Sequence, residues 1–222
     1  MSDFATARRM MVDGQIRPND VTDLRIIAAM LEVPREKFLP QAKMQLAYLD
    51  LDIPILEGPD GRVRRRMVKP MLLAKMIQVA GIRDTDNVLD VGCGSGYSSA
   101  VIAQLARHVI ALEEEGLRSS GAKEILYGLG ITNVSAETGP LSAGYAARAP
   151  YDVIFLQGAT EVEPQTLFPQ LRDGGRLVCV RGGSAGKAIV YRRSGDDVSG
   201  WPVFEATAAV LPGFSAAPAF VF

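Results

Sequence analysis

Side chains suited to metal binding and triad hydrolysis are scarce in this sequence. The 222 residues include two cysteines and one histidine. With His108 as the only histidine, there is no histidine cluster for zinc and no spare histidine for a Ser-His-Asp triad. Cys93 and Cys179 stand alone, so they do not form a disulfide framework. We therefore expect no metal site and no disulfide-based fold.

Excess charge and long apolar runs are also missing. The formal net charge is -1 and the pI is about 5.9, which does not indicate a nucleic-acid partner. No run of 18 apolar residues occurs, and the chain opens on the polar residues 1–3 without an apolar signal core. We expect a soluble cytoplasmic protein without a membrane partner.

The length and composition favour one domain with additions. Hydrophobic residues make up 48% of the chain, which is long enough to bury a large core. No low-complexity linker separates the halves. We predict a single domain over 1–222, with an N-terminal helical cap and substrate-side segment at 1–82 and an α/β core at 83–222.

The rest of the chain is arranged around one glycine-rich stretch at 88–97, Val-Leu-Asp-Val-Gly-Cys-Gly-Ser-Gly-Tyr. An apolar run ends near Asp90, Gly92, Gly94 and Gly96 follow at alternate positions, and a helical pattern begins. Glycine suits such a turn because it accepts a positive φ and lets a ligand approach the backbone. A strand, a glycine turn and a helix start are typical of a nucleotide-type site. The alternative is a plain strand-turn-helix connection.

The Gly-x-Gly-x-Gly spacing differs from the dinucleotide pattern Gly-x-Gly-x-x-Gly. It resembles motif I of the class I methyltransferases that use S-adenosylmethionine (SAM). That resemblance implies that backbone N–H groups of the turn bind the carboxylate of SAM and that Asp90 helps to order its ammonium group. The cofactor-binding residues expected here are Asp90, Gly92, Cys93, Gly94, Ser95, Gly96 and Tyr97.

A second acid follows at a suitable distance. The predicted strand 108–113 ends in Glu113, about 20 residues beyond the glycine turn, where an acid commonly binds ribose hydroxyls. Glu114 and Glu115 come next, so the alternative is that all three acids begin a solvated helix. We expect Glu113 to bind the ribose.

The N-terminal segment predicts short helices. Helical spacing favours helices over 4–15 and 24–33, the second ending before Pro34. Residues 47–54 are expected to be extended. The arginine-rich run 62–66 is interpreted either as a solvated strand or as an anion-binding edge of the cofactor pocket. A helix over 71–80 should begin at Pro70.

From residue 87 onward strands and helices alternate, which predicts a Rossmann-like α/β fold with a mainly parallel sheet covered by helices on both faces. The expected strands are 87–91, 108–113, 133–137, 152–157 and 175–181, and the expected helices are 97–107, 116–128 and 163–171. Further strands at 187–193, 201–207 and 218–222 should form an antiparallel C-terminal edge.

Several segments together resemble the protein-L-isoaspartate O-methyltransferases. They are Val-Pro-Arg-Glu-Lys-Phe at 33–38, Ala-Tyr-Leu-Asp at 47–50, the glycine stretch, Ala-Pro-Tyr-Asp at 149–152, and Leu-Arg-Asp-Gly-Gly-Arg-Leu at 171–177. The resemblance implies methyl transfer from SAM to the free α-carboxylate of an isoaspartyl residue in a damaged protein. It also implies a monomer. The acceptor carboxylate is ionised at neutral pH, so neither a triad nor a metal is required.

The chain departs from this family on the acceptor side. The family carries Thr-Ile-Ser-x-Pro, whereas this chain has Arg-Met-Val-Lys-Pro at 66–70. Val68 replaces the serine and cannot donate a hydrogen bond. We expect Arg66, Arg65 or Lys69 to hold a carboxylate instead, because arginine suits a bidentate contact. No catalytic residue is assigned with certainty, and Arg66, Val68 and Lys69 are the substrate-side candidates.

A second departure lies where the family has Gly-Asp-Gly and the acid approaches the adenine amino group. Here the segment is Gly139-Pro140-Leu141. Pro140 cannot replace the acid, so the N–H of Leu141 or the side chain of Glu137 is the candidate for this contact.

Four functions therefore remain. The first is isoaspartyl repair by SAM-dependent O-methylation. The second is a methyltransferase of the same fold with another carboxylate or small-molecule acceptor. The third is a non-catalytic SAM-binding protein. The fourth, an NAD-dependent dehydrogenase, is disfavoured by the glycine spacing.

Overall fold

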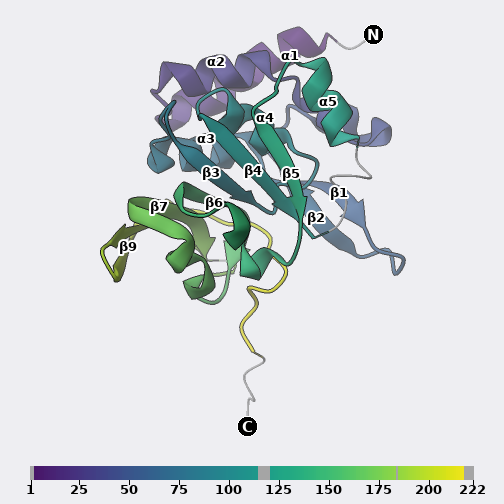
Figure 1. The fold of residues 1–222 in the computed structure, drawn as a ribbon. Coiled ribbons are helices and arrows are strands. Elements are labelled where there is room, and N and C mark those ends of the chain that lie inside the picture. The colour runs from purple at the N-terminus through teal and green to yellow at the C-terminus, as the bar shows by residue number, and fades with distance from the viewer. Residues whose placement is uncertain (1–2, 115–120, 184, 218–222) are drawn as a thin grey trace.

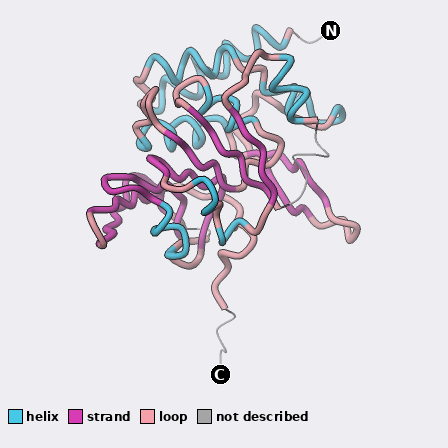
Figure 2. The backbone as a smooth tube through the Cα atoms, viewed as in Figure 1, coloured by secondary structure: helices cyan, strands magenta, loops and turns pink. Residues whose placement is uncertain are grey.

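The computed structural model describes residues 3–114, 121–183 and 185–217. A seven-stranded sheet forms its centre, and a separate hairpin of β1 and β2 lies beside it (Figures 1 and 2). The α-helices are α1 (Phe4–Met11), α2 (Leu24–Glu32), α3 (Pro70–Ala80), α4 (Tyr97–Ala103) and α5 (Ala122–Gly128). The strands are β1 (Ile53–Glu57), β2 (Val63–Met67), β3 (Asn87–Val91), β4 (His108–Glu113), β5 (Val134–Thr138), β6 (Tyr151–Thr160), β7 (Leu171–Arg181), β8 (Lys187–Ser194) and β9 (Asp197–Glu205).

The order of the strands places the glycine turn at the centre of the sheet. The order is β5-β4-β3-β6-β7-β8-β9. The first five strands in this order pair in parallel, whereas β8 pairs antiparallel with both β7 and β9. The parallel sheet and its antiparallel edge confirm the predicted Rossmann-like class. After β3 the chain adds β4 and β5 on one side of that strand and then adds β6 on its other side, so the strand order reverses at β3. Open α/β sheets bind ligands at the carboxyl ends of the strands where the order reverses in this way. The turn after β3 lies there.

The two faces of the sheet are covered differently. On one face Val88, Val109 and Val153 share a core with α1 to α4. On the other face Leu89 and Ile110 pack against short 3₁₀ helices and the C-terminal segment. Figure 1 shows the α-helices gathered on the first face. The sequence predicts helices on both faces. On the second face the described part of the structure has only short 3₁₀ helices, η5 (Leu141–Ala143) and η7 (Gln165–Gln170).

The α-helix expected over 163–171 is wrong, because the structure has the 3₁₀ helix η7 there and β7 begins at Leu171. Pro164 precedes this turn and Pro169 lies inside it. Proline lacks the N–H that an α-helix needs and obstructs the preceding turn. These two prolines therefore limit the segment to one short turn.

Several other boundaries differ from the predictions. The helix expected over 97–107 ends at Ala103, and the first part of the helix expected over 116–128 lies outside the described residues. The last strand begins at Asp197 and not at 201. The strand expected over 218–222 also lies outside the described residues. Of the stretch 47–54, expected to be extended, only the part from Ile53 is strand.

The N-terminal cap packs on the α/β core through apolar side chains. Helix α1 continues into a π-helical turn, Val12–Ile16. Helix α2 begins at Leu24 and is capped by Asp23, whose carboxylate accepts the N–H of Arg25 at 2.9 Å. Helix α2 ends at Glu32, one residue before the Val33-Pro34 pair, as predicted. Met30 is fully buried in the same core as α3 and α4.

Arg35 fastens this cap to the segment that carries the acceptor-side residues. It is fully buried. Its Nε donates to the carbonyl of Ala47 at 2.8 Å, and its Nη2 donates to the carbonyl of Val68 at 2.8 Å. Its guanidinium also lies 4.8 Å from the centre of the Tyr97 ring. The position of Val68 thus depends on a residue more than 30 positions earlier.

Candidate active site

The glycine turn after β3 has the backbone that its sequence predicts. Gly92, Gly94 and Gly96 have φ angles of 76°, 60° and 91°. These values fall in the left-handed region, where glycine is favoured over residues with a Cβ. The N–H of Gly92 donates to the carbonyl of Leu112 at 2.8 Å, which ties the turn to the end of β4. The turn therefore brings the ends of β3 and β4 together.

Asp90 is fully buried below this turn. The hydroxyls of Ser98 and Ser99 donate to its Oδ2 at 2.7 and 2.6 Å. Its Oδ1 is buried and has no hydrogen-bond partner among the described residues. Burial raises the pKa of this carboxyl to about 6, although both hydroxyls favour its charged form. Asp90 is therefore a mainly ionised carboxylate at pH 7 with one oxygen available to a cation.

The two serines were not identified from the sequence. They lie in the first turn of α4, eight and nine positions after the acid they contact. A pair of hydroxyls in the helix that follows the glycine turn was the available signal. Their contact with Asp90 became apparent only when the turn had folded the helix back over β3.

Glu113 ends β4 and is 2% exposed. Its Oε2 accepts the N–H of Gly94 at 2.8 Å and Nε of Arg65 at 3.0 Å. Its Oε1 accepts the N–H of Glu114 at 3.0 Å. Asp90 and Glu113 thus lie at the carboxyl ends of neighbouring parallel strands, on either side of the glycine turn, as the spacing predicts.

The arginine-rich run is only partly a solvated strand. Arg64 is exposed, whereas Arg65 is 6% exposed and reaches into the cleft between the hairpin and the sheet. Besides its ion pair with Glu113, the guanidinium of Arg65 donates to the carbonyl of Gly92. For Arg65, the interpretation as a solvated residue is therefore wrong, because alternation in β2 turns its side chain inward.

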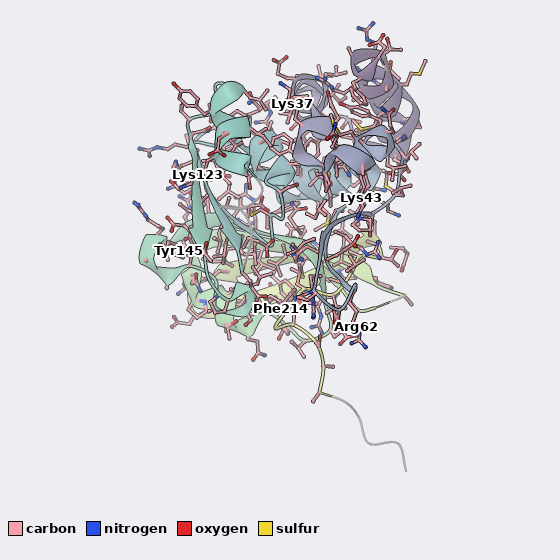
Figure 3. The ribbon with its side chains drawn as sticks, turned by 90° about the vertical axis from the view of Figure 1, so that its right-hand side faces the viewer. Lys37, Lys43, Arg62, Lys123, Tyr145 and Phe214 are labelled. Carbon is pink, nitrogen blue, oxygen red and sulfur yellow. The ribbon has the colours of Figure 1, made fainter. Side chains whose placement is uncertain are left out.

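The hairpin also covers the ligand-facing side of the turn. A Cβ on Gly92 would lie 2.6 Å from Nη2 of Arg65, and one on Gly94 would collide with Cδ1 of Ile55. Figure 3 looks onto this hairpin, with Lys43 near its base and Arg62 toward its far end. Ile55 and Arg65 therefore fill the space beside the turn.

The donors and acceptors of this site fit SAM. Its ammonium group and its ribose hydroxyls require acceptors, which Asp90 and Glu113 are placed to provide, and its carboxylate requires donors such as the N–H groups of the turn. The free Oδ1 of Asp90 and the buried hydroxyl of Ser95, which has no partner among the described residues, are consistent with a polar ligand. Entry of that ligand requires Ile55 and Arg65 to move.

Two of the substrate-side candidates come together, and the third does not. Arg66 and Val68 line a small cavity of about 10 Å³ with Gly92 and Gln157. Lys69 instead lines a separate pocket of about 380 Å³ beside Lys75. Lys69 is thus not brought to the small cavity that adjoins the glycine turn.

Gln157 is a further polar residue that sequence reasoning missed. It lies in β6, next to β3, and is 7% exposed. Its Nε2 is buried and has no hydrogen-bond partner among the described residues. The apolar character of the strand 152–157 concealed it, although a buried amide at the carboxyl half of a parallel strand was the available signal. It lines the small cavity together with Val68, and its amide also favours the charged form of Asp90, which opposes the rise that burial causes in the pKa of that carboxyl.

The other predicted cofactor residues contribute mainly through the backbone or the core. Burial raises the pKa of the Cys93 thiol well above its usual value, so it stays protonated. The ring of Tyr97 packs 5.7 Å from that of Phe38 in the N-terminal core. Leu141 is fully buried on the other face of the sheet, and Glu137 accepts the hydroxyl of Tyr145 at 2.9 Å. An adenine contact by Leu141 stays a prediction.

The described part of the chain offers neither a cluster of metal-binding side chains nor a helix that could cross a membrane. Residues 3–114, 121–183 and 185–217 contain no group of three or more His, Cys, Asp or Glu side chains placed to bind a metal ion. Within the same ranges, no helix has the length and apolar character needed to cross a membrane.

The fold and the site together define a SAM-dependent methyltransferase of the class I, Rossmann-like type. The supporting features are the parallel sheet with an antiparallel edge and the two acids beside the glycine turn at the point where the strand order reverses. The family model for protein-L-isoaspartate(D-aspartate) O-methyltransferase matches residues 7–206. The chain therefore belongs to the protein-L-isoaspartate(D-aspartate) O-methyltransferase family.

Curated relatives agree with this assignment. The chain is 35% identical over 202 residues to protein-L-isoaspartate O-methyltransferase 2 of Shewanella sediminis, a match that covers 90% of this chain and 80% of the relative. It is 39% identical over 198 residues to protein-L-isoaspartate O-methyltransferase 1 of Rhodopseudomonas palustris, covering 88% and 78%.

Solved structures share the fold. A protein-L-isoaspartate O-methyltransferase superposes with a TM-score of 0.78 at 25% identity, covering 95% of this chain and 66% of that one. A putative protein-L-isoaspartate O-methyltransferase from Plasmodium falciparum, solved with S-adenosyl-L-homocysteine, has a TM-score of 0.75 at 16% identity. The match covers 95% of this chain and 99% of that one, and at this identity it supports the fold alone.

Proposed function

We propose that this chain transfers a methyl group from SAM to the free carboxylate of L-isoaspartyl residues in damaged proteins. Membership of the family supports this activity, and the structural observation that carries it is the pair of buried acids, Asp90 and Glu113, beside the glycine turn. The curated relatives are named for L-isoaspartate as the methyl acceptor. The solved Plasmodium falciparum protein was determined in complex with S-adenosyl-L-homocysteine.

When bound, SAM supplies the electrophilic methyl group. In this proposal the carboxylate of Asp90 holds its ammonium group, Glu113 accepts the ribose hydroxyls, and N–H groups at 92–96 bind its carboxylate. The acceptor carboxylate has a reference pKa near 4 and is already ionised, so no residue has to remove a proton. The chain's work is to align the reacting groups and exclude water. Val68 and Met67, both 6% exposed, contribute to that exclusion.

The sequence resemblance implies two departures from the family motif on the acceptor side. Val68 stands where the family has a serine, and Arg66 stands where it has a threonine. Both line the small cavity with Gln157. A guanidinium and an amide can together supply the donors that the two missing hydroxyls would have supplied. A cavity of about 10 Å³ holds no more than one water molecule, so it must widen before a carboxylate can enter. In this proposal the acceptor carboxylate binds there once the hairpin has moved, with Arg66 as the principal charged contact.

The activity test uses methyl-labelled SAM with an isoaspartyl peptide and the matching aspartyl peptide, together with a titration of SAM binding. Label on the isoaspartyl peptide alone supports repair chemistry. SAM binding without transfer to either peptide refutes it. The loss of the hydroxyl at Val68 favours one alternative, a methyltransferase for a different carboxylate, and a panel of small carboxylic acids in the same assay tests that alternative.

The role of Arg66 is tested by Arg66→Ala. We expect KM for the isoaspartyl peptide to rise at least about tenfold, because a charge-assisted hydrogen bond contributes about 1.5–3 kcal/mol. SAM affinity should stay the same. Arg62→Ala on the same hairpin is the matched control, since Arg62 is exposed and pairs only loosely with Asp60 at 3.8 Å. An unchanged KM in Arg66→Ala would refute the assignment.

We further propose that residues 1–222 act as one methyltransferase unit, a monomer in the cytoplasm whose partners are damaged proteins and not nucleic acids. The N-terminal helices share a core with the sheet, which supports one unit. Cys93 and Cys179 are free buried thiols, which is usual in reducing compartments. The near-neutral net charge supports the absence of a nucleic-acid partner.

A further inference from the structure

The ion pair between Arg65 and Glu113 lies within the cofactor site itself. The two side chains are 6% and 2% exposed, and Nε of Arg65 lies 3.0 Å from Oε2 of Glu113. The same guanidinium donates to the carbonyl of Gly92. Both of its contacts are therefore with residues that the cofactor is expected to touch.

Three of the roughly four acceptor sites of Glu113 are occupied, so it cannot accept both ribose hydroxyls while Arg65 stays in place. Its Oε2 already accepts from Arg65 and from the N–H of Gly94, and its Oε1 accepts from the N–H of Glu114. A ribose diol donates to the oxygens of such an acid. Arg65 and the ribose thus compete for the same carboxylate.

A guanidinium that leaves this carboxylate needs another anion, because removing one partner from a buried ion pair leaves an uncompensated charge. The acids on the same hairpin are already engaged. Asp60 pairs with Arg64 at 3.0 Å, and Glu57 pairs with Lys43 at 2.8 Å. Glu114 lines the same pocket but is exposed to solvent, and the carboxylate of SAM is assigned above to the N–H groups of the turn. The anion that still lacks a partner is the carboxylate that is to be methylated.

We propose that Arg65 exchanges partners during the reaction cycle: it pairs with Glu113 until the cofactor binds, and it then binds the acceptor carboxylate. The second half of this statement rests on the proposed function. Arg65 already contacts Gly92, and Gly92 lines the acceptor-side cavity. Binding is consequently ordered, with the cofactor first.

Arg65→Gln separates the two halves of the proposal. Glutamine keeps a donor for the carbonyl of Gly92 but removes the charge and the ion pair. Arg64→Gln is the matched control, because Arg64 is its exposed neighbour in β2 and pairs with Asp60. Calorimetric titration with SAM alone measures the first half, and initial rates with an isoaspartyl peptide at saturating SAM measure the second.

We expect Arg65→Gln to bind SAM about tenfold more tightly than the wild type, and to have an acceptor KM at least about tenfold higher with a smaller change in kcat. Arg65→Lys should recover part of the acceptor KM, because it restores the charge. Arg64→Gln should stay within about twofold of the wild type in both assays. Arg65→Met is a second variant, with the same expected gain in SAM affinity, should the glutamine variant not fold.

Unchanged or weaker SAM binding in Arg65→Gln and Arg65→Met would overturn the exchange. Tighter SAM binding with an unchanged acceptor KM would overturn its acceptor half. If the wild type methylates no isoaspartyl peptide, the proposed function fails and the acceptor half fails with it. The titration with SAM alone still decides, independently of any turnover, whether Arg65 competes with the cofactor.

Discussion

Asp90 should make the protein less stable as pH rises through the weakly acidic range. Burial raises the pKa of this carboxyl from 3.8 to about 6, so the folded chain binds a proton more tightly than the unfolded chain does. The stability that this proton contributes is fully present below the unfolded pKa and is lost as pH rises through the folded pKa. A shift of about two units corresponds to about 3 kcal/mol.

The perturbation is Asp90→Asn, which keeps the shape of the side chain and leaves an oxygen that can accept from Ser98 and Ser99. Urea unfolding of both proteins between pH 4 and pH 8 gives the free energy of unfolding at each pH. We expect the wild type to lose about 2.5 kcal/mol relative to the variant over this range, most of it below pH 7. The full effect is larger because part of it falls below pH 4.

The comparison with the variant is necessary because other acids act in the opposite direction. Hydrogen bonds from Arg25 and Lys43 lower the pKa values of Asp23 and Glu57, and such groups lose stabilising interactions as pH falls. Their contributions cancel in the difference between the two proteins. A difference that does not change with pH, or that changes in favour of the wild type as pH rises, would refute the assignment of a raised pKa to Asp90.

Two further variants test the frame of the site. Arg35→Ala should lower the free energy of unfolding by about 3 kcal/mol or more, because it leaves two buried carbonyls without donors, whereas Arg17→Ala, at an exposed pair with Asp13, should change it by less than about 0.5 kcal/mol in the same urea titration. An equal effect of the two would contradict the role of Arg35. Gly94→Ala should weaken SAM binding at least about tenfold by calorimetry, because φ is 60° and the new Cβ meets Ile55. Wild-type affinity would show that the turn does not approach the cofactor closely.

The cofactor half of the site was predictable because its signals are local. The strands 87–91 and 108–113 have the predicted bounds, since each is a short apolar run between clear breaks. The alternate glycines require a backbone that few other residues adopt. Once two parallel strands are adjacent, their carboxyl ends must lie at the same edge of the sheet. The sequence therefore placed Asp90 and Glu113 close together without any tertiary information.

The hairpin was not predictable in the same way. The composition of 62–66 is compatible with a solvated strand, and Arg64 is indeed exposed. Its neighbour Arg65 is buried because β2 alternates and one of its faces lies against the glycine turn. Which face that is depends on how the hairpin docks, and this is decided by contacts between segments far apart in the sequence.

The sequence by itself thus determined the fold class, the family and the position of Asp90 and Glu113 beside the glycine turn, because strand periodicity, glycine conformations and the strand-end acids depend on residues within a short span. The tertiary structure alone decided that Ser98 and Ser99 bind Asp90, that Gln157 lines the same cavity as Val68, and that Arg65 pairs with Glu113. These contacts depend on packing between separate elements. A buried charge or polar group needs a partner, and packing determines which residue that partner is.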